Sequence, residues 1–262
     1  DKQIHGFQPG QLSIIAARPG MGKTAFTIGC ILHAARLGHP CLLFSQEMSK
    51  ERIVDRVISN EARVNTTSLR NGYLETRDWV NISSATSRLS AMPIHIDDVR
   101  KHTVASIETK ARRWRRDSSV FKSGKEIGLM AIDYLQLIKA PDRRFGESKR
   151  HLDIGDITKS LAALSAELGV ALLLLSQLNR SLESRADKRP MMSDLAESGA
   201  IEADADLICF LYRDEKYNPK SEDKGIAEII IGKQRDGEEG RLKVKFTGEY
   251  TRFDNLSHRQ GY

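Results

Sequence analysis

The chain has 262 residues, of which 29% are charged and 40% are hydrophobic, and its net charge is +6. This composition is typical of a soluble protein, and the length allows one α/β domain with a large core. We expect no membrane span, signal peptide, zinc site or disulfide framework, because no apolar run is long enough and the three cysteines lie far apart. The basic balance weakly favours a polyanionic partner.

Apolar runs and helical spacings divide the chain into strands and helices. In chain order, the predicted elements are a strand at 12–16, a helix from 23 that stops at Gly38, a strand at 41–45, a helix at 50–60, an irregular helical stretch at 63–91, a strand at 94–98, a helix capped by Thr103 and running to 116, a strand at 129–132, a helix at 154–168, a strand at 170–175, a short helical piece at 194–198, and strands at 207–213, 227–234 and 241–246. Strands that alternate with helices and then give way to hairpins predict an α/β fold with a mostly parallel sheet and an antiparallel edge. No repeat or linker divides the chain, so we expect 1–262 to form a single domain.

The first strand, the loop RPGMG and the helix that opens with Lys23 and Thr24 form a pattern typical of a phosphate cradle. The N–H groups of such a loop and the helix N-terminus point at one place, which favours polyphosphate charge there. Lys23 is expected to reach the β- and γ-phosphates, and the Thr24 hydroxyl to hold Mg²⁺. The usual pattern begins with glycine, whereas this chain has Ala17, and the alternative is a tight turn with an exposed Lys23. The residues predicted to bind the nucleotide are Pro19, Gly20, Met21, Gly22, Lys23, Thr24 and Ala25.

Three more polar side chains directly follow buried strands, at the edge where ligands bind in open α/β sheets. Asp133 is the predicted second metal-side group, beside Thr24. Glu47 stands where a carboxylate would orient and deprotonate the attacking water, and Gln177 where an amide would sense the γ-phosphate. The alternatives are an Asp that caps a strand turn and a Glu that faces solvent.

Two cations, Lys233 and Arg235, stand two residues apart at the end of the strand at 227–234. Arginine suits the transition-state charge of phosphoryl transfer, and an arginine finger is worth ~10³–10⁵ in rate. The alternative is a pair of edge-strand charges that discourages aggregation. The residues leave open whether Arg235 reaches its own nucleotide or that of a neighbouring subunit.

The chain contains, in order, the motifs ARPGMGKT, FSQEMS, AIDYLQLI, LLLLSQLNRSLESR, SDLAESGAIEADAD and GKQRDG. Together they resemble the motifs of DnaB-type replicative helicases, within the RecA-like C-terminal motor domain of those hexamers. The resemblance covers 6–253, implies a RecA-like P-loop NTPase core with helices on both faces of the sheet, and suits a phage-encoded member. We expect the family's N-terminal domain and linker helix to be absent from this chain.

The resemblance also implies a role for each candidate residue, with ATP and Mg²⁺ as cofactors. The implied catalytic residues are Lys23 on the phosphates, Glu47 as general base, Gln177 as γ-phosphate sensor, and Lys233 and Arg235 acting on the ATP of the adjacent subunit. Thr24 and Asp133 are implied at the metal, and Arg56 is implied to stack near the base.

Two segments are candidates for lining the DNA channel. The segment Ala196, Glu197, Ser198 and Gly199 matches the family's central-channel loop, whose backbone N–H groups hold the phosphates of a single strand. Many members have arginine where this chain has Ala196, so contacts through the backbone at Gly199 are the ones expected to remain. The charged loop at 139–150, with Arg143 and Arg144, is the other candidate, and its alternative is a solvated loop. No aromatic residue occurs in 178–199, so a strand there would be held by its backbone, without sequence preference.

The sequence therefore predicts an ATP-dependent helicase motor. The resemblance implies that, assembled as a hexameric ring in the full-length protein, it moves 5′ to 3′ on single-stranded DNA and unwinds the replication fork. The expected partners are DNA, further copies of the chain, a primase and a helicase loader, without a membrane. The expected location is the cytoplasm of a bacterium or of a phage-infected cell. Two alternatives share the core: a RecA-type recombinase or clock-type ATPase, and a loader or scaffold that binds ATP and DNA without translocating. Intact Glu47 and Arg235 argue against the second, because a pure switch could lose either.

Overall fold

The computed structural model describes residues 4–117, 120–121, 126–139, 150–195 and 198–256. Within them, nine strands form one sheet in the order β3-β2-β4-β5-β1-β6-β7-β8-β9. The strands are β1 (Leu12–Ala17), β2 (Cys41–Ser45), β3 (Ile94–Asp97), β4 (Leu129–Asp133), β5 (Ala171–Gln177), β6 (Leu207–Tyr212), β7 (Ile226–Gln234), β8 (Gly240–Thr247) and β9 (Arg252–Asp254). The strands β1 to β6 pair in parallel, and β7 to β9 extend the sheet in antiparallel fashion. The predicted mixed sheet is confirmed.

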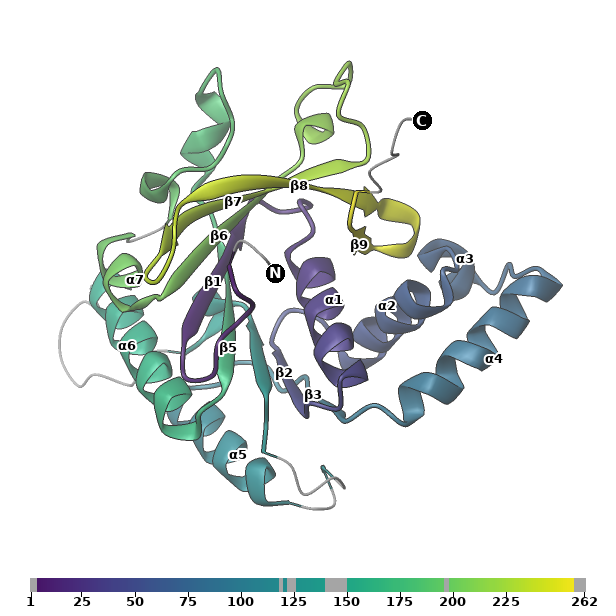
Figure 1. The fold of residues 1–262 in the computed structure, drawn as a ribbon, viewed down its shortest axis with the longest axis horizontal. Coiled ribbons are helices and arrows are strands. Elements are labelled where there is room, and N and C mark those ends of the chain that lie inside the picture. The colour runs from purple at the N-terminus through teal and green to yellow at the C-terminus, as the bar shows by residue number, and fades with distance from the viewer. Residues whose placement is uncertain (1–3, 118–119, 122–125, 140–149, 196–197, 257–262) are drawn as a thin grey trace.

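Helices cover both faces of this sheet, as the sequence predicts, with α1 and α2 on one side and α5 and α6 on the other (Figure 1). The α-helices are α1 (Lys23–Arg36), α2 (Lys50–Ala62), α3 (Thr66–Asn71), α4 (Thr76–Ser90), α5 (Val104–Arg116), α6 (Arg150–Leu168) and α7 (Ser198–Asp204). Short 3-10 turns are η1 (Leu135–Leu137), η2 (Arg180–Ser184), η3 (Met192–Asp194), η4 (Asp214–Lys216) and η5 (Gly248–Tyr250). In the described part of the chain, none of the helices combines the length and the apolar character needed to cross a bilayer.

Alternating side chains of the central strands divide between two cores. From β1, Leu12 and Ile14 pack in the core beneath α5, α6 and α7, whereas Ile15 and Ala17 pack with α1 and the antiparallel strands. All four side chains are fully buried. Because both faces of the strand are covered, its sequence is a continuous apolar run rather than an alternating one.

The irregular helical stretch at 63–91 consists of two helices that extend away from the sheet and pack on α2 (Figure 1). Asn65 caps α3, since its Oδ1 accepts a hydrogen bond from the backbone N–H of Thr67 at 2.8 Å. Gly72 ends that helix with a φ of +76°, in the left-handed region that glycine adopts most readily. The break between α3 and α4 is therefore built into the sequence.

The short helix expected at 194–198 is wrong in place, because the helix begins at Ser198 and runs to Asp204. Asp194 instead ends the 3-10 turn η3, where its carboxylate accepts from the N–H of Met191 at 2.9 Å. The same carboxylate pairs with Arg185 at 2.7 Å. A side chain occupied in this way cannot cap the next helix.

Strand direction decides which residues meet. The parallel strands β1, β2, β4 and β5 end at one edge of the sheet, which we call the carboxyl edge. Because β7 runs antiparallel to β6, its last residues lie beside the first residues of β6, with Lys233 opposite Ile208. We call that end of the sheet the amino edge.

Candidate active site

The loop between β1 and α1 is shaped by two glycines. Gly20 and Gly22 have φ angles of +78° and +107°, a region that side chains rarely adopt. A Cβ on Gly22 would lie 3.0 Å from Cζ of Phe253 in β9, so a side chain there would be both strained by the backbone angle and crowded by this ring. Gly22 is also the N-cap of α1 and provides no side-chain cap. The N–H groups of the first turn therefore lack an intrahelical acceptor and favour an anion.

Lys23, the first residue of α1, is a partly buried cation beside two carboxylates. Its Nζ donates to the main-chain oxygen of Ser176 at 3.0 Å and lies 5.2 Å from the ring centroid of Tyr134. Burial lowers the pKa of Lys23 to about 8, and the negative charges of Asp133 and Glu47 oppose that shift. A bound polyphosphate would add negative charge next to the Lys23 ammonium group and so favour its charged form.

Thr24 and Asp133 are joined directly, as the sequence predicts of neighbours at this edge. The Thr24 hydroxyl donates to Oδ2 of Asp133 at 2.7 Å. Asp133 ends β4 and is 1% exposed, and burial raises its pKa against the opposing effects of Thr24 and Lys23. Its second oxygen, Oδ1, is buried and has no hydrogen-bond partner among the described residues.

This pair fits a magnesium ion. Mg²⁺ in nucleotide sites is held by one or two protein oxygens together with phosphate oxygens and water, and the Thr24 hydroxyl and the unpartnered Asp133 oxygen are such donors. Across the described ranges, no group of three His, Cys, Asp or Glu side chains could hold a metal by itself. The residues suit a metal that arrives with a triphosphate.

Glu47 and Arg56 share this neighbourhood. Glu47 lies exposed in the bend after β2, whose last residue, Ser45, is opposite Asp133. The charge of Glu47 raises the pKa of Asp133 in addition to the effect of burial. Burial lowers the pKa of Arg56 in α2, and Asp133 and Glu47 oppose that shift. Carboxylate and guanidinium groups thus flank the phosphate loop on the side of β2.

Gln177 ends β5 opposite Ala17 of β1, at the same edge. Its backbone is held by Gln136, whose Nε2 donates to the Gln177 oxygen at 3.2 Å and whose Oε1 accepts from the Gln177 N–H at 3.2 Å. The sequence reasoning did not single out Gln136. The available signal was its position three residues after Asp133, in the motif AIDYLQLI.

Lys233 and Arg235 lie at the amino edge, away from Lys23 of the same chain. Lys233 Nζ donates to the main-chain oxygen of Ala205 at 2.7 Å, and the Arg235 guanidinium pairs with Asp206 at 2.8 Å. Asp206 in turn accepts from the N–H of Leu12, the first residue of β1, at 2.9 Å. The sequence had left open whether Arg235 reaches its own nucleotide or that of a neighbouring subunit. The geometry places both cations away from the chain's own candidate nucleotide site.

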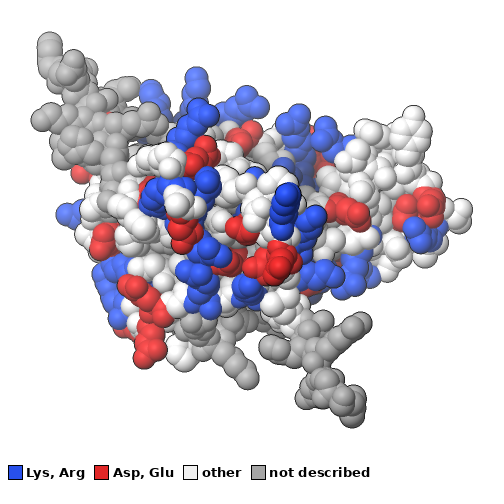
Figure 2. Space-filling model, turned by 90° about the horizontal axis from the view of Figure 1, so that it is seen from above, with Lys and Arg blue, Asp and Glu red and all other residues white. Residues whose placement is uncertain are grey.

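The candidate DNA-contacting residues are described only in part. Arg143, Arg144, Ala196 and Glu197 lie outside the described residues. Ser198 and Gly199 are the first two residues of α7, rather than part of a loop. On the face seen in Figure 2, Lys and Arg side chains are interspersed with Asp and Glu, so the positive charge is not gathered into one patch there.

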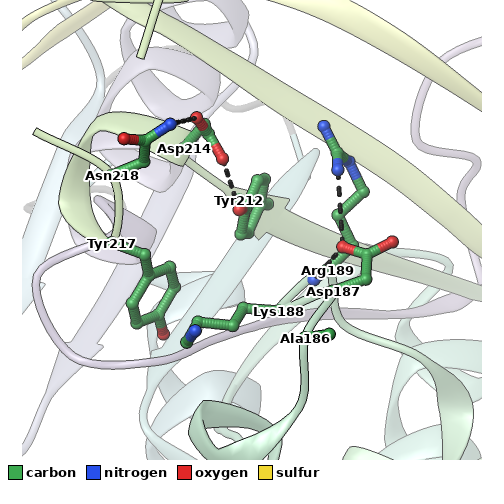
Figure 3. Close-up of a pocket in the computed structure, with 8 residues that line it drawn as sticks. All are labelled: Ala186, Asp187, Lys188, Arg189, Tyr212, Asp214, Tyr217 and Asn218. Atoms are coloured by element: carbon green, nitrogen blue, oxygen red, sulfur yellow. Dashed lines mark hydrogen bonds and ion pairs between the residues drawn. The ribbon is translucent and has the colours of Figure 1, made fainter. Parts of the chain in front are cut away.

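A cavity of about 340 Å³ lies between the segment after β5 and the β6–β7 connection (Figure 3). Its lining is formed by Ala186, Asp187, Lys188, Arg189, Tyr212, Asp214, Tyr217 and Asn218. The Tyr212 hydroxyl donates to Asp214 at 2.8 Å, and Arg189 pairs with Glu228 at 2.7 Å. Because the polar groups around the cavity already have hydrogen-bond or ion-pair partners, we interpret them as a structural cluster and not as the phosphate site.

Comparison with known proteins gives consistent matches. The model of the family "DnaB-like helicase C terminal domain" matches residues 1–255. The replicative DNA helicase DnaB of Pasteurella multocida is 47% identical over 263 residues, which are 99% of this chain and 54% of that protein. Replicative DNA helicase DnaB of Geobacillus stearothermophilus is 44% identical, over 99% of this chain and 55% of that protein. The chain thus spans about half the length of the curated relatives it matches.

Two solved structures share the fold. One is a DnaB-like replicative helicase described with its interactions with primase, with a TM-score of 0.91 and 37% identity over 98% of this chain and 60% of that one. The other is the ATPase domain of G40P, with the same TM-score and identity, over 98% of this chain and 88% of that one. The fold is therefore that of these RecA-like ATPase domains.

Proposed function

Because the chain belongs to the DnaB-like helicase C-terminal domain family, we propose that it is the motor of a replicative DNA helicase, driven by ATP hydrolysis. The observation that supports this best is the meeting of Lys23, Thr24 and Asp133 at one edge of the sheet. A cation, a hydroxyl and a buried carboxylate with an unpartnered oxygen form a site for a metal-bound triphosphate.

In hydrolysis, Lys23 and the N-terminus of α1 bind the β- and γ-phosphates. Glu47 accepts a proton from a water molecule, the water oxygen bonds to the γ-phosphorus, and the bond between that phosphorus and the β,γ-bridging oxygen breaks. The products are ADP and phosphate. Thr24, with Asp133 beside it, would hold Mg²⁺, and the ion would supply positive charge that offsets the charge of the phosphates. Gln177 senses the loss of the γ-phosphate at the end of β5.

The remaining cations come from a second copy. Lys233 and Arg235 lie at the amino edge, so one chain cannot bring them to its own γ-phosphate. In a hexameric ring, the amino edge of one subunit faces the carboxyl edge of the next, and Arg235 stabilises the transition-state charge there. Hydrolysis is then tied to assembly.

The work of the motor is movement of a single DNA strand, 5′ to 3′, with unwinding of the fork. Gly199 and Ser198, at the N-terminus of α7, would hold strand phosphates through backbone N–H groups, while Arg143 and Arg144 would line the channel. Loss of the γ-phosphate shifts β5 and β7 and the segments they carry. We further propose a primase and a helicase loader as partners, and the cytoplasm of a bacterium or of a phage-infected cell as the location.

A strand-displacement assay tests this function, with ATP hydrolysis measured in the same mixture. The protein should unwind a forked duplex with ATP and Mg²⁺, and Glu47→Ala should abolish both unwinding and hydrolysis. Hydrolysis without strand separation would favour a recombinase-like or clock-like ATPase. Unwinding that persists in Glu47→Ala would refute the role given to this residue.

A further inference from the structure

Hydrogen bonds close the bend that carries Glu47. Ser45 Oγ, at the start of the bend, donates to the main-chain oxygen of Met48 at 2.7 Å and accepts from the Met48 N–H at 3.3 Å. The N–H of Gln46 donates to the main-chain oxygen of Asp133 at 2.8 Å. Glu47 therefore projects from a closed bend that is attached to the end of β4.

The side chain of Gln46 provides a second attachment. It is 4% exposed, and its Oε1 accepts from the backbone N–H of His102 at 3.0 Å. Its Nε2 is buried and has no hydrogen-bond partner within the described ranges. The carboxamide is therefore used through its oxygen alone, as an acceptor for one buried N–H group.

His102 is a fixed anchor for this bond. Its main-chain oxygen accepts from the N–H of Lys139 at 2.8 Å. Its ring is 2% exposed, lies 3.0 Å from Oγ of Ser106, and meets the ring of Phe44 edge-on, with centroids 5.3 Å apart. The backbone of His102 is thus held on both of its polar sides.

The segment at 98–102, which contains His102, also contacts the chain just after the bend. Oδ2 of Asp98 accepts from the N–H of Lys50 at 2.8 Å, at the first residue of α2. Ser49, the N-cap of α2, makes no side-chain cap of its own. The segment at 98–102 therefore makes hydrogen bonds to residues on both sides of Glu47.

We propose that Gln46 is a positioning residue, which sets the reach of the Glu47 carboxylate by anchoring its bend to the N–H of His102. The inference rests on the proposed function, in which Glu47 accepts the proton of the attacking water. Gln46 and Glu47 share a peptide bond, so the bond from the His102 N–H to Gln46 restrains the backbone position from which Glu47 projects. Misplacement of a catalytic group by about 1 Å can cost on the order of 10²-fold in rate.

The test is the variant Gln46→Met, which keeps the length of the side chain and removes the strong acceptor. We expect kcat for ATP hydrolysis to fall about tenfold or more, with KM within about twofold, because Lys23 and α1 still bind the phosphates. The matched control is Ser165→Ala in α6, which removes another buried side-chain hydrogen bond, from Ser165 Oγ to the main-chain oxygen of Val170 at 2.7 Å, without touching the Glu47 bend. Its kcat should stay within about twofold of wild type at a temperature where all proteins are folded.

The proposal is overturned if Gln46→Met loses no more kcat than Ser165→Ala, or if its loss lies in KM. Should Gln46→Met not fold, Gln46→Glu decides, because it retains an acceptor oxygen at the same place. A kcat within about tenfold of wild type then supports the proposal, and a deeper loss overturns it.

Glu47→Gln separates this inference from the proposed function. If the wild-type protein hydrolyses no ATP, or if Glu47→Gln hydrolyses it normally, the proposed function or the role of Glu47 fails. If both behave as proposed and Gln46→Met alone has no effect, only the role of Gln46 fails.

Discussion

The cations at the two edges of the central sheet differ in burial and in pairing. At the carboxyl edge, Lys23 is partly buried, its pKa is lowered to about 8, and one oxygen of the neighbouring Asp133 has no hydrogen-bond partner in the part of the chain that the structure describes. At the amino edge, Arg235 is 57% exposed and is already paired with Asp206, and Lys233 caps main-chain oxygens at the end of α7. One edge holds a partly buried cation and a buried carboxylate, whereas the other holds cations that are already paired, with that of Arg235 exposed.

This difference supports the proposed division of labour between subunits. A buried, incompletely paired group is costly unless a ligand completes it, so the carboxyl edge suits the proposed nucleotide substrate. An exposed ion pair is worth little and can be exchanged for a stronger partner at low cost. The amino edge is therefore suited to giving its arginine to the next subunit.

The largest effect should follow from the amino edge. Arg235→Ala should lower kcat for ATP hydrolysis by about 10³-fold or more, because it removes charge stabilisation in the transition state. Affinity for a nucleotide analogue should change little, since Arg235 lies away from the chain's own phosphate loop. Titration with a fluorescent analogue and steady-state kinetics measure the two quantities. Arg112→Ala, which removes an exposed arginine of α5, is the control, and an equal loss there would contradict the assignment.

At the carboxyl edge, Glu47→Gln should lower kcat by about 10²- to 10⁴-fold, since the amide cannot accept the proton. Nucleotide should still bind, because Lys23 and the N-terminus of α1 are intact. Single-turnover hydrolysis reports the chemical step directly. A normal rate in that assay would remove Glu47 from the mechanism.

An equimolar mixture of the two inactive variants tests whether the carboxyl edge of one chain works with the amino edge of another. In mixed assemblies of Glu47→Gln and Arg235→Ala chains, about a quarter of the interfaces combine an intact Glu47 with an intact Arg235. Activity should therefore return to roughly that fraction of wild type. If the mixture stays as inactive as its components, the two residues do not meet across an interface.

A smaller effect concerns stability of the ligand-free protein. The pKa of Lys23 is 10.5 ordinarily and about 8 in the folded chain, because burial disfavours its charge. Between these values the unfolded chain binds more protons, so wild-type stability should rise with pH across that range. Lys23→Met lacks the penalty, so it should be the more stable protein below pH 8, by up to about 3 kcal/mol, with the gap closing toward pH 10.5. Urea unfolding across that range measures the gap, and a gap independent of pH would contradict the burial argument.

The carboxyl edge could be read from the sequence because each of its residues follows a local pattern. Asp133 ends an apolar run, and parallel strands bring such ends together. The position of Arg235 could not be read, because it depends on which strand β7 pairs with and in which direction. Gln136 and Gln46 escaped notice for a related reason: their partners, Gln177 and His102, lie tens of residues away along the chain.

Short elements were the other failure. The strand β9 spans only Arg252–Asp254, too few residues to show a period of two. The helical piece predicted at 194–198 was misplaced, because Asp194 ends the 3-10 turn η3 and α7 begins only at Ser198. Local patterns predict elements well where they are long, and long-range hydrogen bonds decide the rest.

The contact between Phe253 and Gly22 has a consequence for biosynthesis. The ring of Phe253 also meets Phe26 edge-on, with centroids 5.6 Å apart, so the last strand of the sheet covers the base of the phosphate loop. A nascent chain still threaded through the ribosome lacks this covering until residue 253 has emerged. The phosphate loop is thus completed by a strand far downstream in the chain, and a polypeptide truncated before β9 would carry the nucleotide motif without the aromatic ring that packs against it.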